Sequence, residues 1–317
     1  MFKSKTKLEL FYEIFLAAIV LIIIIQPDIE RPLFQFIYEN TLWIIFTIIG
    51  LGMLFLLIKK ENLVIYSLLT AAVLAFYLKS ISNSDLIYKS IQDGKNSFTI
   101  DHYAGEDFNE NLEDLIKILK RSNADIISIG ELAPRENKEL IVVLDNIYPY
   151  HAALNTIDFN SKVILSKFKI NKIDTFFLAG NPQLKIQFNI INNYVYILFP
   201  YMLPFDNNQN SKEPEKQLEK LSNEALDIKN SPSIIIGEFN QVYWSKDMRG
   251  FLYKTKLNNV RRFAYAFANR NPYNHIFFSD LVNCLHFEDL MDSHSERIGL
   301  RAKFELSDPE MYSYKHP

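Results

Sequence analysis

Two acidic residues follow apolar, strand-like runs of the chain. Glu131 comes after the run 125–129 and one glycine, and Glu238 follows the run 233–236 in the same way. Asn240 lies two residues beyond Glu238. Carboxylate and amide oxygens are the ligands that hard divalent cations such as Mg²⁺ and Mn²⁺ prefer. A carboxylate therefore sits at each of two strand ends, and residue type alone leaves open whether the pair is solvated or binds such a cation.

The histidines offer one candidate for acid–base chemistry. His294 has Asp292 two residues before it, and a histidine oriented by a carboxylate can act as a general base that activates water. The remaining histidines considered, His151, His275 and His286, lack metal-ligand spacing and are expected to be structural. We therefore consider His294 as an alternative general base.

Composition argues against several other classes of function. The net charge of -3 provides no excess of basic residues for neutralising phosphates. A single cysteine, Cys284, excludes an intramolecular disulfide, and nine glycines offer no glycine-rich phosphate cradle. Arg261 and Arg262 adjoin Phe263 and Tyr265, but a solvated surface explains this cluster better than a nucleic-acid patch. Nucleic acid is therefore not an expected partner.

The elements that must position the candidate residues alternate between helix and strand. Apolar residues recur at helical spacing from Leu112 to Leu119, and a short buried strand follows before Glu131. A further apolar strand is predicted at 194–199, and alternation between 302 and 306 predicts a strand with one exposed face. This order is typical of a layered α/β domain with a mixed sheet, which we place at residues 97–308, with a tail at 309–317.

The first 80 residues contain three apolar segments. They cover 10–26, 42–58 and 63–78, each about 16 or 17 residues long. That is slightly short of the roughly 20 residues that span a bilayer core, but aromatic residues at their ends can extend them. We predict a three-helix transmembrane anchor at 1–80 and a polar connector at 81–96.

Positive charges predict the orientation of this anchor. Lys3, Lys5 and Lys7 precede the first segment, and Lys59 and Lys60 lie between the second and third. Because positive residues favour the cytoplasmic side, the N-terminus is expected in the cytoplasm. With three spans in the inner or plasma membrane, the large domain would then be periplasmic or extracellular.

Six segments of the remaining sequence carry a family resemblance. They are ADIISIGE at 124–131, IYPY at 147–150, VILSK at 163–167, GEFNQVYWS at 237–245, NHIFFS at 274–279 and SERIGLR at 295–301. In this order they resemble motifs of the endonuclease/exonuclease/phosphatase superfamily, the fold of pancreatic-type DNases, sphingomyelinases and inositol phosphatases. The resemblance implies a four-layered α/β sandwich (DNase I-like), behind a three-span anchor as in some bacterial members.

The resemblance also implies a chemistry. In the family, a divalent cation held by a carboxylate polarises the phosphate, and a histidine paired with an aspartate activates water. Glu131 matches the metal carboxylate, whereas Arg297 occupies the position of the general base and cannot accept a proton at ordinary pH. Asn274 replaces the aspartate that orients the base, and Glu296 replaces the acidic residue of the last motif.

Three further family positions differ. The signature aspartate is Glu238, although the following Asn240 is retained. Tyr201 replaces a histidine that contacts phosphate, and the early asparagine is missing, with Asp101 or His102 nearest to its place. We therefore predict a catalytically degenerate site.

Three functions remain open on these grounds. The first is binding of a phosphorylated ligand, a lipid headgroup or a protein partner by a degenerate domain. The second is an active, Mg²⁺- or Mn²⁺-dependent phosphodiesterase or phosphatase, in which Glu131, Glu238 and Asn240 organise the metal and His294 or Asp101 assists. The third is a structural subunit of a membrane complex.

Overall fold

A computed structural model of the protein describes residues 7–25, 32–81, 97–104, 112–156, 161–203, 213–261, 273–292 and 297–307. The described residues form two compact units. One consists of the N-terminal helices together with 241–249, and the other contains the α/β domain. The tail at 309–317 lies outside the described residues, and so does the predicted connector at 81–96 except for Ile81, which ends a helix.

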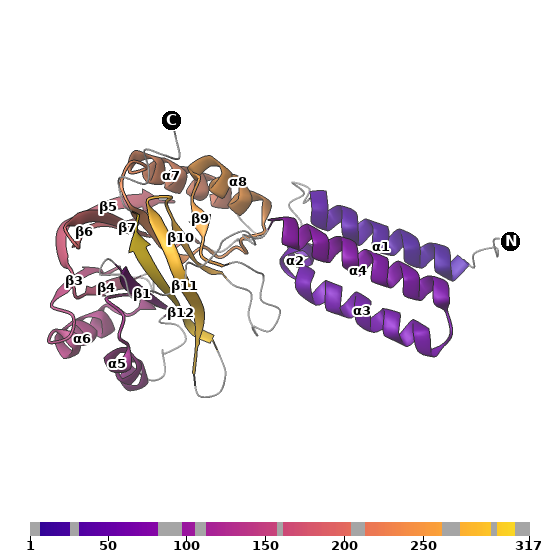
Figure 1. Ribbon diagram of the computed structural model, residues 1–317, viewed down its shortest axis with the longest axis horizontal. Helices are drawn as coiled ribbons and strands as arrows, with labels where there is room; N and C mark the ends of the chain where they lie inside the picture. The colour runs from indigo at the N-terminus through magenta and orange to yellow at the C-terminus, as the bar shows by residue number, and fades with distance from the viewer. Residues whose placement is uncertain are drawn as a thin grey trace. The chain divides into compact units, whose positions relative to one another are not determined.

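The N-terminal unit is built from helices (Figure 1), whose bounds are α1 (Lys7–Ile25), α2 (Pro32–Glu39), α3 (Thr41–Leu57) and α4 (Glu61–Ile81). The hydroxyl groups of Tyr12 in α1 and Ser67 in α4 are 2.8 Å apart. Gly52 of α3 faces Ser67 so closely that a Cβ at this position would lie 3.1 Å from the serine Cβ. A small residue in α3 therefore permits close packing against α4.

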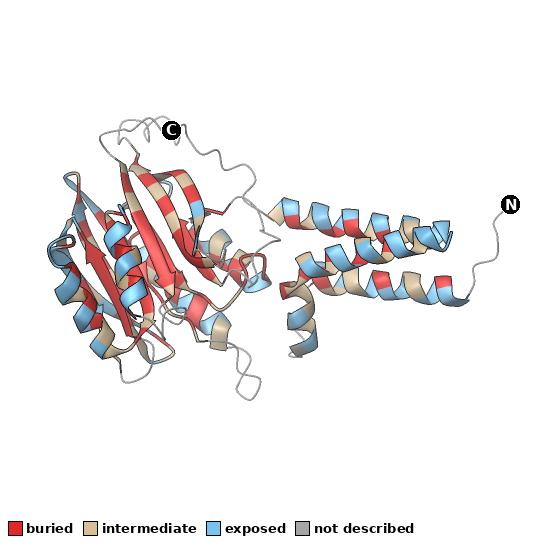
Figure 2. Ribbon diagram, turned by 90° about the horizontal axis from the view of Figure 1, so that it is seen from below, coloured by how far each residue is buried: buried red, intermediate tan, exposed pale blue. Residues whose placement is uncertain are grey.

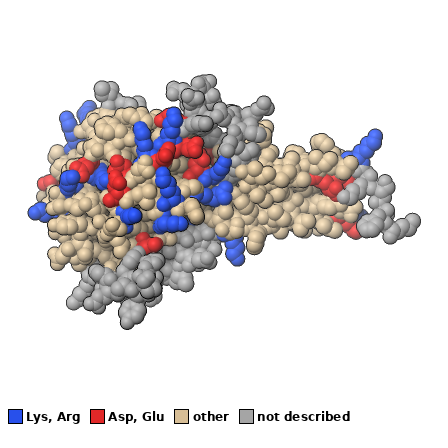
Figure 3. Space-filling view, turned by 90° about the horizontal axis from the view of Figure 1, so that it is seen from above, with Lys and Arg blue, Asp and Glu red and all other residues tan. Residues whose placement is uncertain are grey.

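Two of these helices are long and apolar enough to cross a membrane, among the residues described. They are α1, with 19 residues, and α4, with 21, and only 11% and 22% of their most apolar windows are buried. Their surfaces are largely exposed in Figure 2 and carry few charges in Figure 3. The helix predicted at 42–58 is also present as α3, but it has 17 residues. Its role as a third span stays a prediction.

The α/β domain contains two sheets. In the first, the described strands follow the order β11 (Val282–Met291), β12 (Arg297–Leu306), β1 (Ser97–Ala104), β2 (Ile126–Leu132), β4 (Ser161–Ser166) and β3 (Tyr150–Leu154). In the second, the order is β5 (Lys169–Leu178), β6 (Asn181–Ile190), β7 (Asn193–Phe199), β8 (Ser233–Glu238), β10 (Asn274–Phe278) and β9 (Asn258–Asn259). The pairs β1–β2 and β7–β8 are parallel, whereas the other neighbours are antiparallel.

The two sheets pack face to face over one apolar core. Phe98, Ile164 and Phe304 of the first sheet share this core with Ile197 and Ile234 of the second. The strand interiors are buried (Figure 2), as expected for sheets covered on both faces. The predicted strands before Glu131 and Glu238 are therefore confirmed as central, buried elements.

Helices cover the outer faces. On the first sheet, α5 (Leu112–Arg121) and α6 (Pro134–Leu144) bury Leu115, Leu119 and Leu140 in a second apolar cluster. On the second sheet, α7 (Glu213–Asp227) is tied to β6 by a 2.9 Å ion pair between Glu224 and Lys185. The domain therefore has the α/β arrangement with two stacked sheets that the sequence predicted.

Candidate functional site

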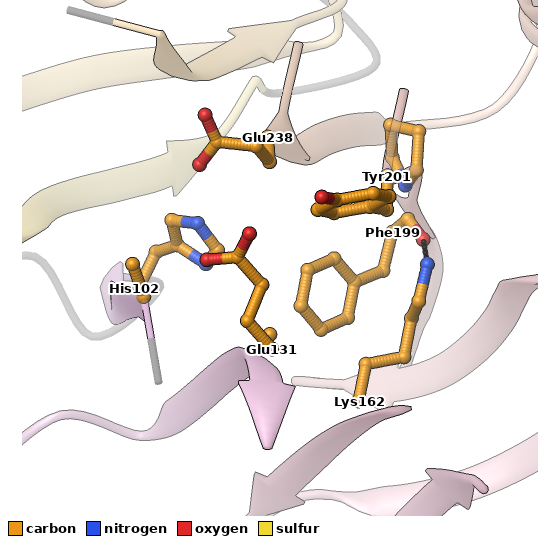
Figure 4. A pocket seen from close by; sticks show the side chains of 9 residues that line it. His102, Glu131, Lys162, Phe199, Tyr201 and Glu238 are labelled. Carbon is orange, nitrogen blue, oxygen red and sulfur yellow. Dashed lines mark hydrogen bonds between the residues drawn. The ribbon is translucent and has the colours of Figure 1, made fainter. Parts of the chain in front are cut away.

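A pocket opens where the ends of β1, β2, β7 and β8 meet. It is lined by His102, Ala104, Gly130, Glu131, Lys162, Phe199, Pro200, Tyr201 and Glu238. Figure 4 shows the Glu131 carboxylate between the His102 ring and Tyr201, with Glu238 on the opposite side of the pocket. The structure thus brings together three of the predicted site residues, which are Glu131, Tyr201 and Glu238.

Two site residues have a left-handed backbone. Glu131 has a φ of 60°, at a point where the β2–β4 register shifts between Ile129 and Leu132, and Asn240 has a φ of 51°. Asparagine adopts this conformation readily, but for a glutamate it costs about 1–2 kcal/mol. The strain at Glu131 directs its side chain into the pocket, and such strain is concentrated at functional sites.

Gly237 allows β7 and β8 to meet at the pocket. A Cβ at this position would lie 2.1 Å from the carbonyl oxygen of Pro200, so a larger residue would push the strand ends apart. Beyond it, the amide of Met202 donates to the carbonyl of Glu238 at 2.9 Å. The side chain of Asn240 donates to the carbonyl of Met202 at 2.6 Å. The segment GEFNQVYWS at 237–245, here called the signature segment, therefore holds the backbone next to Tyr201 in place.

Tyr201 lies against the acidic side chains. Burial raises the pKa of its hydroxyl, and the negative charges of Glu131 and Glu238 act in the same direction, as does a hydrogen bond with Glu131. The backbone amide of Tyr201 donates to Oε1 of Gln183 at 2.8 Å. Tyr201 is thus a neutral hydrogen-bond donor at neutral pH.

His102, rather than Asp101, faces the pocket. Its Nδ1 is 3.0 Å from Oγ of Ser128, and its ring packs edge-on against Phe199 at 5.6 Å. Burial lowers the pKa of His102 to about 4, and the positive charges of Arg297 and Lys162 also lower it. Because an effective general base has a pKa near the working pH, His102 is poorly suited to activating water.

Asp101 points to the other face of β1 because neighbouring residues of a strand alternate in direction. Its carboxylate accepts two hydrogen bonds from Arg301, at 2.8 and 2.7 Å, and one from Oγ of Ser122 at 2.7 Å. The hydroxyl of Tyr103 donates to it at 3.2 Å. Asp101 thus belongs to a buried ion pair beneath α5 and not to the pocket.

Lys162 is the pocket residue that sequence analysis missed. It is buried at 1% exposure, and burial lowers its pKa to about 7, although the charge of Glu131 raises it. Its Nζ donates to Oε1 of Gln183 and, at 3.3 Å, to the carbonyl of Phe199. The sequence feature that could have revealed it is a lysine in a strand that is buried on both faces, one residue before the VILSK motif.

Arg297 is paired with an acidic residue. Its guanidinium lies 3.8 Å from the carboxylate of Asp289. The same carboxylate accepts hydrogen bonds of 3.1 and 2.8 Å from Arg261, which is buried and stacks on Phe287. Arg261 is therefore part of the interior, so the expectation of a solvated surface is wrong for this residue.

The remaining predicted residues are divided between the two units. Asn274 pairs with Glu238 across β10 and β8. In the other unit, Trp244 of the signature segment is buried, and its Nε1 donates to the carbonyl of Tyr38 in α2 at 3.0 Å. His294 and Glu296 lie outside the described residues, so the assignment of His294 as a base stays a prediction.

The described residues do not fit a divalent cation well. Among them, no group of three histidine, cysteine, aspartate or glutamate side chains is placed to hold a metal ion. The pocket offers the carboxylates of Glu131 and Glu238, but the ammonium of Lys162 lines the same pocket. When it is protonated, Lys162 adds a positive charge to the pocket, which disfavours a second cation. The chemistry that the arrangement supports directly is hydrogen bonding and charge pairing.

Comparison with known structures places the fold. A protein of the endonuclease/exonuclease/phosphatase family from Bacteroides thetaiotaomicron is 14% identical, with a TM-score of 0.53, over 67% of this chain and 98% of that one. TDP2 from D. rerio, humanized by 14 mutations, is 13% identical with a TM-score of 0.52, over 66% and 99%. A mannosyl-6-phosphatase from Bacteroides thetaiotaomicron VPI-5482 is 15% identical with a TM-score of 0.50, over 67% and 100%. At these identities the likeness shows the fold alone.

Sequence comparisons agree with this placement. A search of curated proteins gives no significant match. Residues 96–294 match the model of the endonuclease/exonuclease/phosphatase family, which is more than half of the chain. The chain therefore belongs to the endonuclease/exonuclease/phosphatase family.

Proposed function

We propose that the protein is a membrane-anchored member of this family whose domain acts in binding and does not hydrolyse phosphoesters. The main support comes from Arg297, which stands where the family's general base is expected. It is an arginine, its guanidinium lies 3.8 Å from Asp289, and arginine does not lose its proton in proteins. Losing a positioned base removes about 10²- to 10⁴-fold of rate.

The pocket adds support from its other residues. The neutral imidazole of His102 is too weak a base near neutral pH, since burial lowers its pKa to about 4. Tyr201 stands where the resemblance expects a phosphate-contacting histidine, and it lies against Glu131 instead. Two carboxylates at the pocket repel the negative charge that a phosphoester brings, unless a cation compensates them.

Activity of the full-length chain in detergent micelles tests this proposal. Generic phosphomonoester and phosphodiester substrates, p-nitrophenyl phosphate and bis-p-nitrophenyl phosphate, are offered with Mg²⁺ or Mn²⁺ to the wild type and to Glu131→Gln. We expect that the wild type shows no more metal-dependent turnover than Glu131→Gln. Turnover that disappears in Glu131→Gln would overturn the proposal and make the protein a working phosphoesterase.

The membrane part of the proposal concerns topology. Lysines near the N-terminus and at Lys59 and Lys60 support a cytoplasmic N-terminus, with three spans placing the domain outside the cytoplasm. Cys284 is 3% exposed, so a membrane-impermeant maleimide has little background reaction. In intact cells we expect Lys229→Cys, in the domain, to be labelled and Lys60→Cys to be protected. The opposite pattern would contradict this topology.

A further inference from the structure

The short helix α2 has an exposed apolar face. Leu33 and Phe36 are three residues apart, so they share one side of the helix, and they are 64% and 63% exposed. Glu39, the only charged residue of α2, is buried. With 8 residues, about 12 Å of helix, α2 is too short to cross a bilayer core of about 30 Å. A short helix with an uncharged apolar face fits the boundary between lipid and water.

The residues that follow α2 support this position. In the chain α2 lies between α1 and α3 (Figure 1), and α3 begins two residues after α2 ends. Trp43, near the start of α3, is exposed, and its ring lies 6.4 Å from that of Phe46, which is also exposed. Tryptophan is enriched at membrane interfaces because its ring is apolar and its N–H is polar. The exposed apolar residues of α3 therefore continue onto α2.

The second tryptophan of the chain binds the end of α2. Carbonyl groups at the end of a helix are short of partners within the helix. The carbonyl of Tyr38 accepts hydrogen bonds from Nε1 of Trp244 at 3.0 Å and from Oγ1 of Thr41 at 2.6 Å. Trp244 is buried, and residues 241–249 belong to the same compact unit as the helices. The signature segment, which also carries Glu238, thus caps α2.

We propose that α2 is a membrane-interface helix whose partner is the zwitterionic headgroup region of the bilayer, and that Trp244 docks the signature segment on it. Since the exposed face of α2 carries no charge, the contact depends on burial of Leu33 and Phe36 and not on anionic lipid. The inference rests on the membrane-anchored part of the proposed function. It goes beyond that part because it gives a lipid contact to a helix outside the three predicted spans.

The full-length chain in phosphatidylcholine vesicles tests the lipid contact. A fluorescent maleimide is attached to Phe36→Cys, and the buried Cys284 gives little background. We expect brominated phosphatidylcholine to quench this label and aqueous iodide to have little effect. Replacing part of the lipid by phosphatidylglycerol should change neither result. Tyr194→Cys, at an exposed aromatic residue of β7, is the matched control, and its label should be quenched by iodide and not by brominated lipid.

The docking of the signature segment has its own measurement. The chain has two tryptophans, so Trp43→Phe leaves Trp244 as the only one. We expect energy transfer from Trp244 to dansyl-labelled phosphatidylethanolamine in the vesicles. Adding Leu33→Glu and Phe36→Glu, which place charges on the face that contacts lipid, should reduce this transfer. Both positions are exposed, so these changes leave the packed interior of the unit intact.

A second pair of substitutions controls for the added charge. Ile173→Glu and Phe177→Glu alter exposed apolar positions of β5, and together they should leave the transfer unchanged. Two outcomes would overturn the inference. One is a label at Phe36→Cys that iodide quenches and brominated lipid does not. The other is a transfer from Trp244 that is absent or that the charges on α2 do not reduce.

The proposed function can fail separately. Leu21 is an exposed residue of α1, and a label at Leu21→Cys that brominated lipid does not quench would contradict the membrane anchor itself. Quenching by lipid at Leu21→Cys without quenching at Phe36→Cys would contradict only the inference. Turnover of phosphoesters, measured as above, would contradict the binding role and leave the lipid contact of α2 intact. These measurements therefore distinguish the failures.

Discussion

Adjacent residues of β1 face two different groups of polar side chains. Asp101 faces α5 and is satisfied by Arg301, Ser122 and Tyr103. His102 faces the pocket, where Lys162, Glu131 and Glu238 meet. The first network is a closed set of matched donors and acceptors, whereas the second contains an excess of carboxylates and a strained backbone at Glu131. A network built for stability satisfies its charges, and a functional pocket retains backbone strain.

The largest expected effect is loss of the Asp101 network. Asp101→Asn keeps the shape of the side chain but leaves Arg301 and Ser122 without a charged acceptor, so we expect a loss of about 3 kcal/mol of unfolding free energy. Denaturant unfolding of the full-length chain in detergent measures this. The exposed pair Lys172–Asp174 provides the control, since Asp174→Asn should cost less than about 1 kcal/mol. Equal losses would show that the two pairs contribute alike.

The pH dependence of stability probes the pocket side of β1. Burial lowers the pKa of His102 from 6.5 to about 4, so the unfolded chain binds more protons between these values. Stability due to this residue is complete above pH 6.5 and is lost as the pH falls from 6.5 to 4, by about 3 kcal/mol. The Tm of His102→Gln should therefore decline less than that of the wild type from pH 6.5 to pH 4. Parallel curves would contradict a buried, neutral His102.

A double-mutant cycle tests whether Glu131 and Lys162, which line the same pocket, interact. Glu131→Gln and Lys162→Met should each destabilise the chain, and the double variant should be more stable than the sum of their effects predicts, by about 1–2 kcal/mol. Unfolding free energies of the four proteins give this coupling. Additive effects would mean that Lys162 does not compensate Glu131.

The smallest effect concerns the backbone at Glu131. Glu131→Asn and Glu131→Gln both remove the carboxylate, but asparagine tolerates a φ of 60° and should be the more stable of the two by about 1 kcal/mol. Because both variants lack the carboxylate, the difference between their unfolding free energies measures the backbone strain alone. Equal unfolding free energies would indicate that the left-handed conformation carries no strain here.

Local sequence patterns were enough to predict the main elements and the fold class. Short apolar runs predicted the strands before Glu131 and Glu238, and these are β2 and β8 of two stacked sheets. Apolar runs predicted helices at the N-terminus, and α1 and α4 have the length of a span. Short-range patterns suffice here because periodicity and strand-end positions are local properties. The six motifs also pointed to the family whose sequence model matches residues 96–294.

The set of side chains that share the pocket could be known only from the packed fold. In the sequence, Asp101 and His102 were equally good candidates for the position of the family's early asparagine. The face of the sheet on which each side chain lies is fixed only when the sheet packs on α5. Lys162 became visible because β4 places it beside Gln183 and Phe199, residues 21 and 37 positions away. Charge compensation depends on distances between such remote segments, which no local pattern of the sequence encodes.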